Sequence, residues 1–136
     1  MYNFALTENG LQRAAFGGGG YAYGSSAAFQ KNKGLRRSVL PTHYSAIMSS
    51  DYNGCTALVE VICNNSIKKI GSMAFFGCYS LKKVDLTRNT EIPTLESYNA
   101  FQKTATDLEI LVPASLAEEW KKASNWVTYA DNIKGV

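Results

Sequence analysis

The sequence predicts an α/β repeat protein, a solenoid of about four coils of ~23 residues with short parallel strands, capped by a C-terminal helix. Self-similarity is the first observation, because sliding the chain by 23 residues aligns IMSSDYNGCTALVEV with IGSMAFFGCYSLKKV. The second is an alternation of apolar and polar residues at the end of each copy, which is typical of a strand. The third is a tail after residue 113 that breaks the repeat and shows helical spacing.

Each copy contains an apolar residue, usually Ala-Phe, often Gly-Cys, and then Leu-x-x-Val or Leu-x-x-Leu. A shift of 46 residues places Ala28-Phe29 on Ala74-Phe75, and LESYNAFQKTATDLEILVP repeats the pattern downstream with small insertions. A unit of this length cannot bury its own apolar face. We therefore expect the copies to stack, so that equivalent residues form one continuous core column.

The stretch from residue 74 to residue 86 predicts the local structure of one copy. After Leu81 we expect a short strand in which Val84 points inward and its two neighbours point outward. The Ala-Phe half is expected to form a helical or 3₁₀ turn on the opposite side, where Phe75 fills the column. Gly77 is expected to end that turn at a positive φ. The first copy is imperfect, because Ser38 occupies the core position of Val84.

The stretches SMAFFGCYSLKKVDL and YNAFQKTATDLEILVP resemble the BspA-like class of leucine-rich repeats, whose pattern is an Ile, then AF, then GC, then LxxIxIP. The resemblance implies a curved leucine-rich-repeat solenoid with a strand face available for binding. It also implies a protein of bacteria or some protists that is mostly surface-located or secreted, often an adhesion or host-interaction module. Similar repeats occur beside phage tail genes. The resemblance implies no catalytic residue.

Three segments follow from these patterns: an N-terminal cap or Gly-rich attachment segment at 1–22, BspA-like repeats at 23–113, and a C-terminal helical cap at 114–136. In the tail, Ser115 and Glu118 are expected to form a capping box that starts a helix. Glu118 and Lys122 are expected to form an i, i+4 pair. Two apolar sets then cover the end of the column: first Leu116, Trp120 and Ala123, and then Trp126, Tyr129 and Ile133.

The N-terminal end of the solenoid has no clear cap in the sequence. Phe4, Leu6, Leu11 and Phe16 suffice for one short capping element, and FGGGGYAYGSS at residues 16–26 resembles a flexible linker. Either this segment covers the first repeat or another chain does. The second option makes homo- or hetero-assembly through the N-terminal segment a hypothesis.

Composition excludes several classes of protein. With 136 residues, of which 46% are hydrophobic, the chain can bury the core of one domain and is not compositionally disordered. A formal net charge of +3 is weak grounds for a nucleic-acid partner, and we do not expect one. No apolar run approaches the length of a membrane span.

Motifs for catalysis, cofactors and metals are missing from the sequence. The glycine run lacks the Gly-Lys-Ser/Thr of a P-loop, and Tyr23 breaks the GxGxxG spacing. His43 is the only histidine, so a catalytic triad or a Cys-His pair would have to use it, and we expect it to be a surface turn residue rather than a general base. No cysteine or histidine cluster has metal-ligand spacing. We therefore expect a protein that is not an enzyme and that uses no cofactor or metal.

The three cysteines are an odd number, so at least one is not in an intrachain disulfide. Cys55 and Cys78 occupy equivalent positions and are expected to stack in the column as buried thiols. The alternative is a disulfide between stacked copies, because neighbouring strands lie about 4.8 Å apart, within reach of the required Cα separation.

The outward positions of the strands are the predicted partner-binding face. Arg36-Arg37 and Lys82-Lys83 are repeat mates that could form a basic stripe, but Val59-Glu60 interrupts it, which favours an ordinary solvated face. Three of the residues expected to point outward are apolar: Ile62, Ile110 and Val112. Exposed apolar residues are unusual without a partner, so they favour a role of this face in binding. Phe76 joins the set because its repeat mate is Asn53, so its ring lies outside the ladder. The candidate residues are Arg37, Glu60, Ile62, Phe76, Lys83, Asp85, Ile110 and Val112.

The leading functional prediction is a non-enzymatic binding module for a protein or glycan, of the bacterial cell-surface or adhesion type. Such a protein would be extracellular or at the cell surface if a leader is missing from this chain. The alternative is a structural component of a phage virion or a tail-associated assembly, located in the particle or the host cytoplasm. The initiator Met, the absent signal peptide and the linker-like N-terminus favour that alternative.

Overall fold

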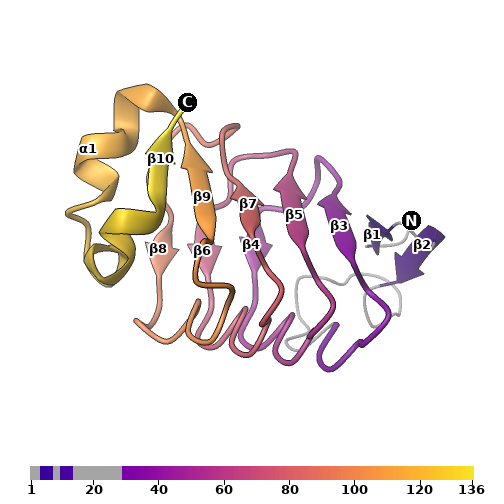
Figure 1. Ribbon diagram of the computed structural model, residues 1–136. Coiled ribbons are helices and arrows are strands. Elements are labelled where there is room, and N and C mark those ends of the chain that lie inside the picture. Colours follow the sequence, from indigo (N-terminus) through magenta and orange to yellow (C-terminus); the bar gives the residue numbers. More distant parts are fainter. Residues whose placement is uncertain (1–3, 8–9, 14–28) are drawn as a thin grey trace.

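The computed structural model describes residues 4–7, 10–13 and 29–136. They form a solenoid in which each coil crosses from a larger sheet to a smaller one and returns through a ridge of turns (Figure 1). The larger sheet has seven strands in the order β10-β9-β7-β5-β3-β1-β2. Its central strands run parallel and come from successive coils: β3 (Arg37–Leu40), β5 (Glu60–Cys63), β7 (Lys83–Asp85) and β9 (Glu109–Val112). The predicted repeat solenoid is confirmed.

The predicted inward and outward positions of β7 are also confirmed. Val84 is fully buried, and it pairs in register with Val61 of the preceding strand. On either side of Val84, the side chain of Lys83 is exposed and that of Asp85 is half-buried. The two-residue periodicity of a strand therefore separates a core face from an outer face across the whole stack.

A second sheet lies behind the first and was missed by sequence reasoning. It consists of three two-residue parallel strands, β4 (Ala46–Ile47), β6 (Lys69–Ile70) and β8 (Thr94–Leu95). The residues that follow were expected to form a helical or 3₁₀ turn, and this prediction was wrong, because the structure has a run of separate turns there. Met73 at φ 56° and Gly77 at φ 79° interrupt the chain before a helix can propagate. The positive φ expected of Gly77 is confirmed.

The core column is a ladder of stacked rings, one from each coil. Centroid separations are 4.9 Å from Phe29 to Tyr52, 5.0 Å from Tyr52 to Phe75 and 5.1 Å from Phe75 to Phe101. These separations match the spacing of neighbouring strands, since each ring occupies the same position in its own coil. Trp126 of the C-terminal segment closes the ladder at 5.8 Å from Phe101.

One polar pair lies inside this column. Ser38 is fully buried at an inward strand position. Its hydroxyl oxygen forms a hydrogen bond of 2.8 Å with the hydroxyl oxygen of Tyr52. The serine that breaks the repeat pattern and the tyrosine that replaces phenylalanine therefore satisfy each other. Burial raises the pKa of the Tyr52 hydroxyl well above its usual range.

The C-terminal residues pack as a cap on the last coil. They comprise η1 (Ala114–Leu116), the one-turn helix α1 (Ala117–Trp120), η2 (Trp126–Asn132) and β10 (Ile133–Gly135), which adds a parallel strand to β9. The predicted capping box is absent, since neither η1 nor α1 has a side-chain cap hydrogen bond. Glu118 pairs with Lys121, 3.5 Å away, rather than with Lys122. The helix is too short to bring an i, i+4 pair together.

The cap uses side chains where a further coil would use its backbone. In the stack, Phe75 N–H donates to Ala100 C=O in the next coil at 2.8 Å. The equivalent Phe101 N–H donates to the hydroxyl of Tyr129 at 3.2 Å, and that hydroxyl in turn donates to Tyr98 C=O. The amide of Asn132 likewise donates to Leu108 C=O at 2.9 Å. The last coil therefore keeps its backbone hydrogen bonds, which buried polar groups require.

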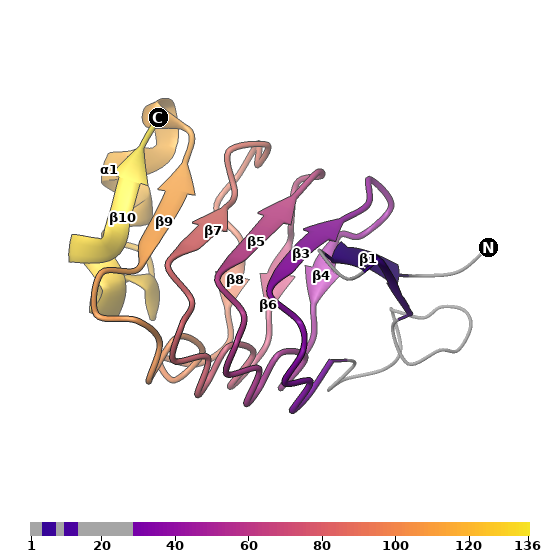
Figure 2. The same ribbon diagram turned by 45° about the vertical axis from the view of Figure 1, so that its right-hand side comes forward.

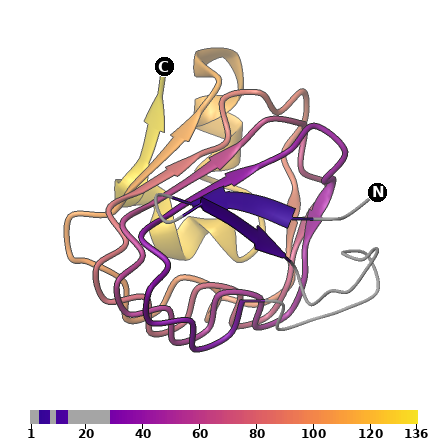
Figure 3. The same cartoon turned by 90° about the vertical axis from the view of Figure 1, so that its right-hand side faces the viewer.

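At the other end, β1 (Phe4–Thr7) and β2 (Gly10–Arg13) form an antiparallel hairpin that extends the large sheet. Leu6 pairs antiparallel with Val39 of β3. Figure 3, which looks along the stack from this end, shows the hairpin in front of the first coil. Residues 14–28, which include Phe16 and the glycine-rich stretch at 16–26, lie outside the described residues.

Candidate binding face

No other described element covers the outer face of β3, β5, β7 and β9 (Figure 2). The in-register pairing of these strands arranges its side chains in two rows. We call them the charged row and the mixed row. The charged row consists of Arg37, Glu60, Lys83 and Glu109, and the mixed row consists of Val39, Ile62, Asp85 and Leu111.

The charged row is largely neutralised by its own ion pairs. Glu60 accepts from Arg37 Nε at 3.0 Å through Oε1, and its Oε2 lies 3.5 Å from Lys83 Nζ. These side chains remain partly exposed, so each pair contributes at most about 1 kcal/mol to stability. Their main consequence is for recognition, because Glu60 interrupts what could have been a basic stripe.

The mixed row is apolar except at one position. Val39, Ile62 and Leu111 are all half-buried, and Asp85 lies between Ile62 and Leu111. Thr87 donates to Asp85 Oδ1 twice, from its backbone N–H at 2.9 Å and from its hydroxyl at 2.6 Å. The carboxylate is therefore held in place among apolar neighbours.

Two of the predicted partner residues do not lie on this face. Ile110 and Val112 were expected to point outward, but both are fully buried. The error is a one-residue slip in register: Ile110, not Leu111, pairs with Val84, and a slip of one residue exchanges the two faces of a strand. The outward residue is Leu111. It was found only through the pairing of β9 with β7, since Ile, Leu and Val in sequence give no periodicity.

The structure brings five of the predicted residues together and separates a sixth from them. The five on the outer face are Arg37, Glu60, Ile62, Lys83 and Asp85. Phe76 lies instead in the turns between β6 and β7, where it is half-buried. Val39, which sequence reasoning missed, could have been found from its place two residues after Arg37 on the same strand face.

A shallow groove of about 480 Å³ crosses the beginning of these strands. Val59 contributes an apolar side chain that is 43% exposed, and the rest of the lining is charged. Lys82 pairs with Asp107 across this groove at 3.9 Å. The charged lining residues are Glu60, Lys82, Lys83, Asp107 and Glu109.

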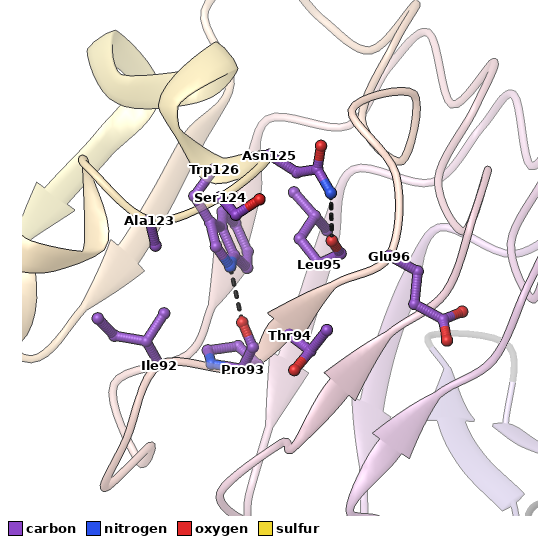
Figure 4. A pocket seen from close by; sticks show the side chains of 9 residues that line it. All are labelled: Ile92, Pro93, Thr94, Leu95, Glu96, Ala123, Ser124, Asn125 and Trp126. Carbon is purple, nitrogen blue, oxygen red and sulfur yellow. Dashed lines mark hydrogen bonds between the residues drawn. The ribbon is translucent and has the colours of Figure 1, made fainter.

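A larger cavity of about 780 Å³ lies between β8 and the cap (Figure 4). Two side chains of the cap already bind its carbonyl groups: Trp126 Nε1 donates to Pro93 C=O at 2.8 Å, and the Asn125 amide donates to Leu95 C=O at 2.7 Å. Glu96 is the only titratable residue in the lining, and Lys69 pairs with it at 3.6 Å. This lining holds no set of groups for acid, base or nucleophilic chemistry.

The cysteines are core residues. All three are buried and free, and the Cys55 and Cys78 thiols donate to Phe29 C=O and Tyr52 C=O, each at 3.0 Å. Burial raises the pKa of the Cys55 thiol to about 11 and raises the pKa values of Cys63 and Cys78 as well. Such thiols are poor nucleophiles at neutral pH. The buried-thiol alternative is the one seen in the structure.

Among the described residues, no group of three or more His, Cys, Asp or Glu side chains could hold a metal ion. His43 lies in the turn where it was expected, and its buried Nε2 has no hydrogen-bond partner among the described residues. No helix in the described part of the chain has the length and apolar character needed to cross a membrane.

Comparison with known proteins gives one match. Residues 24–120 match the family model described as BspA type leucine rich repeat region, in six copies, where the sequence had suggested about four. No curated protein and no solved structure matches the chain at a significant level. Repeat regions of this family are generally non-enzymatic, bind proteins and are typically surface-associated.

Proposed function

Since the chain belongs to the BspA-type leucine-rich repeat family, we propose that it is a non-enzymatic module that binds a protein through the outer face of its seven-stranded sheet. The observation that carries the proposal is the mixed row. Val39, Ile62 and Leu111 form apolar surface on a sheet face that no described element covers. Apolar residues gathered on an exposed face are typical of a recognition surface.

A protein ligand accounts for this face better than a glycan. The row presents aliphatic side chains and charges rather than exposed aromatic rings, and interfaces between proteins combine an apolar centre with a charged rim. The charged row and the groove supply such a rim. We further propose a role at the bacterial cell surface, of the adhesion type, which the typical location of the family supports.

The experiment is a binding screen on arrays of extracellular proteins and glycans, made with matched variants. Ile62→Arg places a charge in the centre of the mixed row. Val127→Arg makes the same kind of change on the cap, where Val127 is 59% exposed. Circular dichroism checks that both variants fold.

The expected result is protein binding that Ile62→Arg abolishes and Val127→Arg preserves. Binding that survives Ile62→Arg, or binding to glycans alone, would overturn the proposal.

A further inference from the structure

We propose that Asp85 and Glu109 select the partner, so that the outer face takes a protein segment presenting a lysine or arginine side chain between apolar side chains. This inference rests on the proposed function and adds the chemistry of the ligand. Three observations carry it: the position of Asp85 in the mixed row, the ion pairing of the surrounding charges, and the orientation of the carboxylate.

Position is the first observation. The positions equivalent to Asp85 in the neighbouring coils hold Ile62 and Leu111, in register on either side. A carboxylate flanked by aliphatic side chains matches the two parts of a lysine or arginine. The stem of such a side chain packs on apolar surface while its charged end reaches the acid.

Charge is the second observation. Lys83, beside Asp85 on β7, is paired with Glu60, and Lys82 is paired with Asp107. Among the described residues, no ion pair reaches Asp85 or Glu109. Glu60 is shared by Arg37 and Lys83, so the two rows together hold three carboxylates and two cations, a net charge of −1, although the chain as a whole has a formal charge of +3. A basic partner is the complement of that surface.

Orientation is the third observation. Both hydrogen bonds from Thr87 reach Oδ1 of Asp85. Within the described part of the chain, Oδ2 accepts no hydrogen bond, so it is available to a partner. A carboxylate that is already held in place loses little side-chain entropy when a cation binds, which favours a specific and directional contact.

The experiment selects ligands from a phage-displayed random peptide library on the immobilised full-length protein. Affinities of the enriched peptides are then measured for the wild type, for Ile62→Arg, and for Asp85→Asn, Glu109→Gln and the double variant of these two carboxylates. Asp85→Asn keeps an acceptor oxygen for Thr87 and removes only the charge. Glu119→Gln on α1 makes the same change in net charge as each single variant, away from the face, and Glu118→Gln/Glu119→Gln makes the same change as the double variant, so these are the matched controls.

We expect the enriched peptides to carry Lys or Arg next to apolar residues. Because charge-assisted contacts dominate, the double variant should weaken binding by about tenfold or more, whereas the matched controls should leave it unchanged. Binding should also weaken as NaCl is raised to about 0.5 M, where the screening length falls to a few ångströms.

The failing outcomes distinguish this inference from the proposed function. Peptides that lose binding in Ile62→Arg but carry no basic residue, or that bind the double variant as tightly as the wild type, overturn the inference alone. Peptides that bind Ile62→Arg as well as the wild type overturn the proposed function. A library from which nothing is enriched counts against both.

Discussion

Tyr52→Phe is expected to destabilise the protein by about 1–3 kcal/mol, because it leaves the buried hydroxyl of Ser38 without a partner. Ser38 is fully buried and Tyr52 is 1% exposed, so water does not replace the lost contact of 2.8 Å. Ser38→Val should cost a similar amount, since it leaves the Tyr52 hydroxyl unpaired instead.

The double variant Ser38→Val/Tyr52→Phe should recover this loss. It recreates the Val61–Phe75 pair, whose members lie 23 residues further along the chain and are both fully buried. It also removes both buried hydroxyls, and the new valine adds methyl groups, each of which contributes about 0.8 kcal/mol when buried. The double variant should therefore be within about 1 kcal/mol of the wild type or more stable, with a coupling energy of about 2 kcal/mol or more between the sites.

The assay is urea unfolding of the four proteins, followed by far-ultraviolet circular dichroism. Stability differences are read from the midpoints, provided that the denaturant slope is the same in all four. Strict additivity of the two single changes would refute the reasoning, because it would mean that the hydroxyls do not satisfy each other in the folded protein.

Two further predictions concern the thiols and a close backbone approach. Burial raises the cysteine pKa values in the folded protein, to about 11 for Cys55, so the thiols of the unfolded chain lose their protons at lower pH. The free energy of unfolding should therefore fall as the pH rises above about 9. The fall is at most about 1.4 kcal/mol per pH unit for each thiol. Ellman's reagent at pH 8 should find three reactive thiols only after unfolding, and fast reaction of the native protein would contradict burial. Gly71→Ala places a Cβ 2.3 Å from Ser49 N and should cost more than about 3 kcal/mol in urea unfolding. The control Gly77→Ala meets only ordinary contacts at φ 79° and should cost about 1–2 kcal/mol, so equal losses would contradict the steric argument.

Much of the column could be predicted from the sequence because the repeat has a constant period. A shift of 23 residues brings Tyr52 onto Phe75 and Cys55 onto Cys78, and stacked coils place residues of equal position one above the other. The same argument placed Ser38 in the core. It did not identify the partner of Ser38, because that contact joins a strand of one coil to the ring of the next.

The candidate face could be predicted only where the strands alternate clearly between apolar and polar residues. Lys83, Val84 and Asp85 show their faces in the sequence, and the structure agrees. In β9 three consecutive apolar residues fit either orientation, so the alignment that placed Leu111 inward was as consistent with the pattern as the correct one. The inward strand residue follows the core ring by nine residues in both coils, from Phe75 to Val84 and from Phe101 to Ile110, so matching Leu108 with Leu81 placed the strand one residue too far along the chain.

The sequence by itself determined the coil, its period, and which residues of each regular copy are buried, because these depend on local periodicity and on the need of each unit to cover its neighbour. Tertiary structure decided the register of β9, the extra strand β10 and the isolation of Asp85 among Ile62 and Leu111. These features depend on which residues of separate strands lie opposite each other. Cross-strand pairing sets burial and charge compensation on a sheet face, and no single strand carries that information in its own sequence.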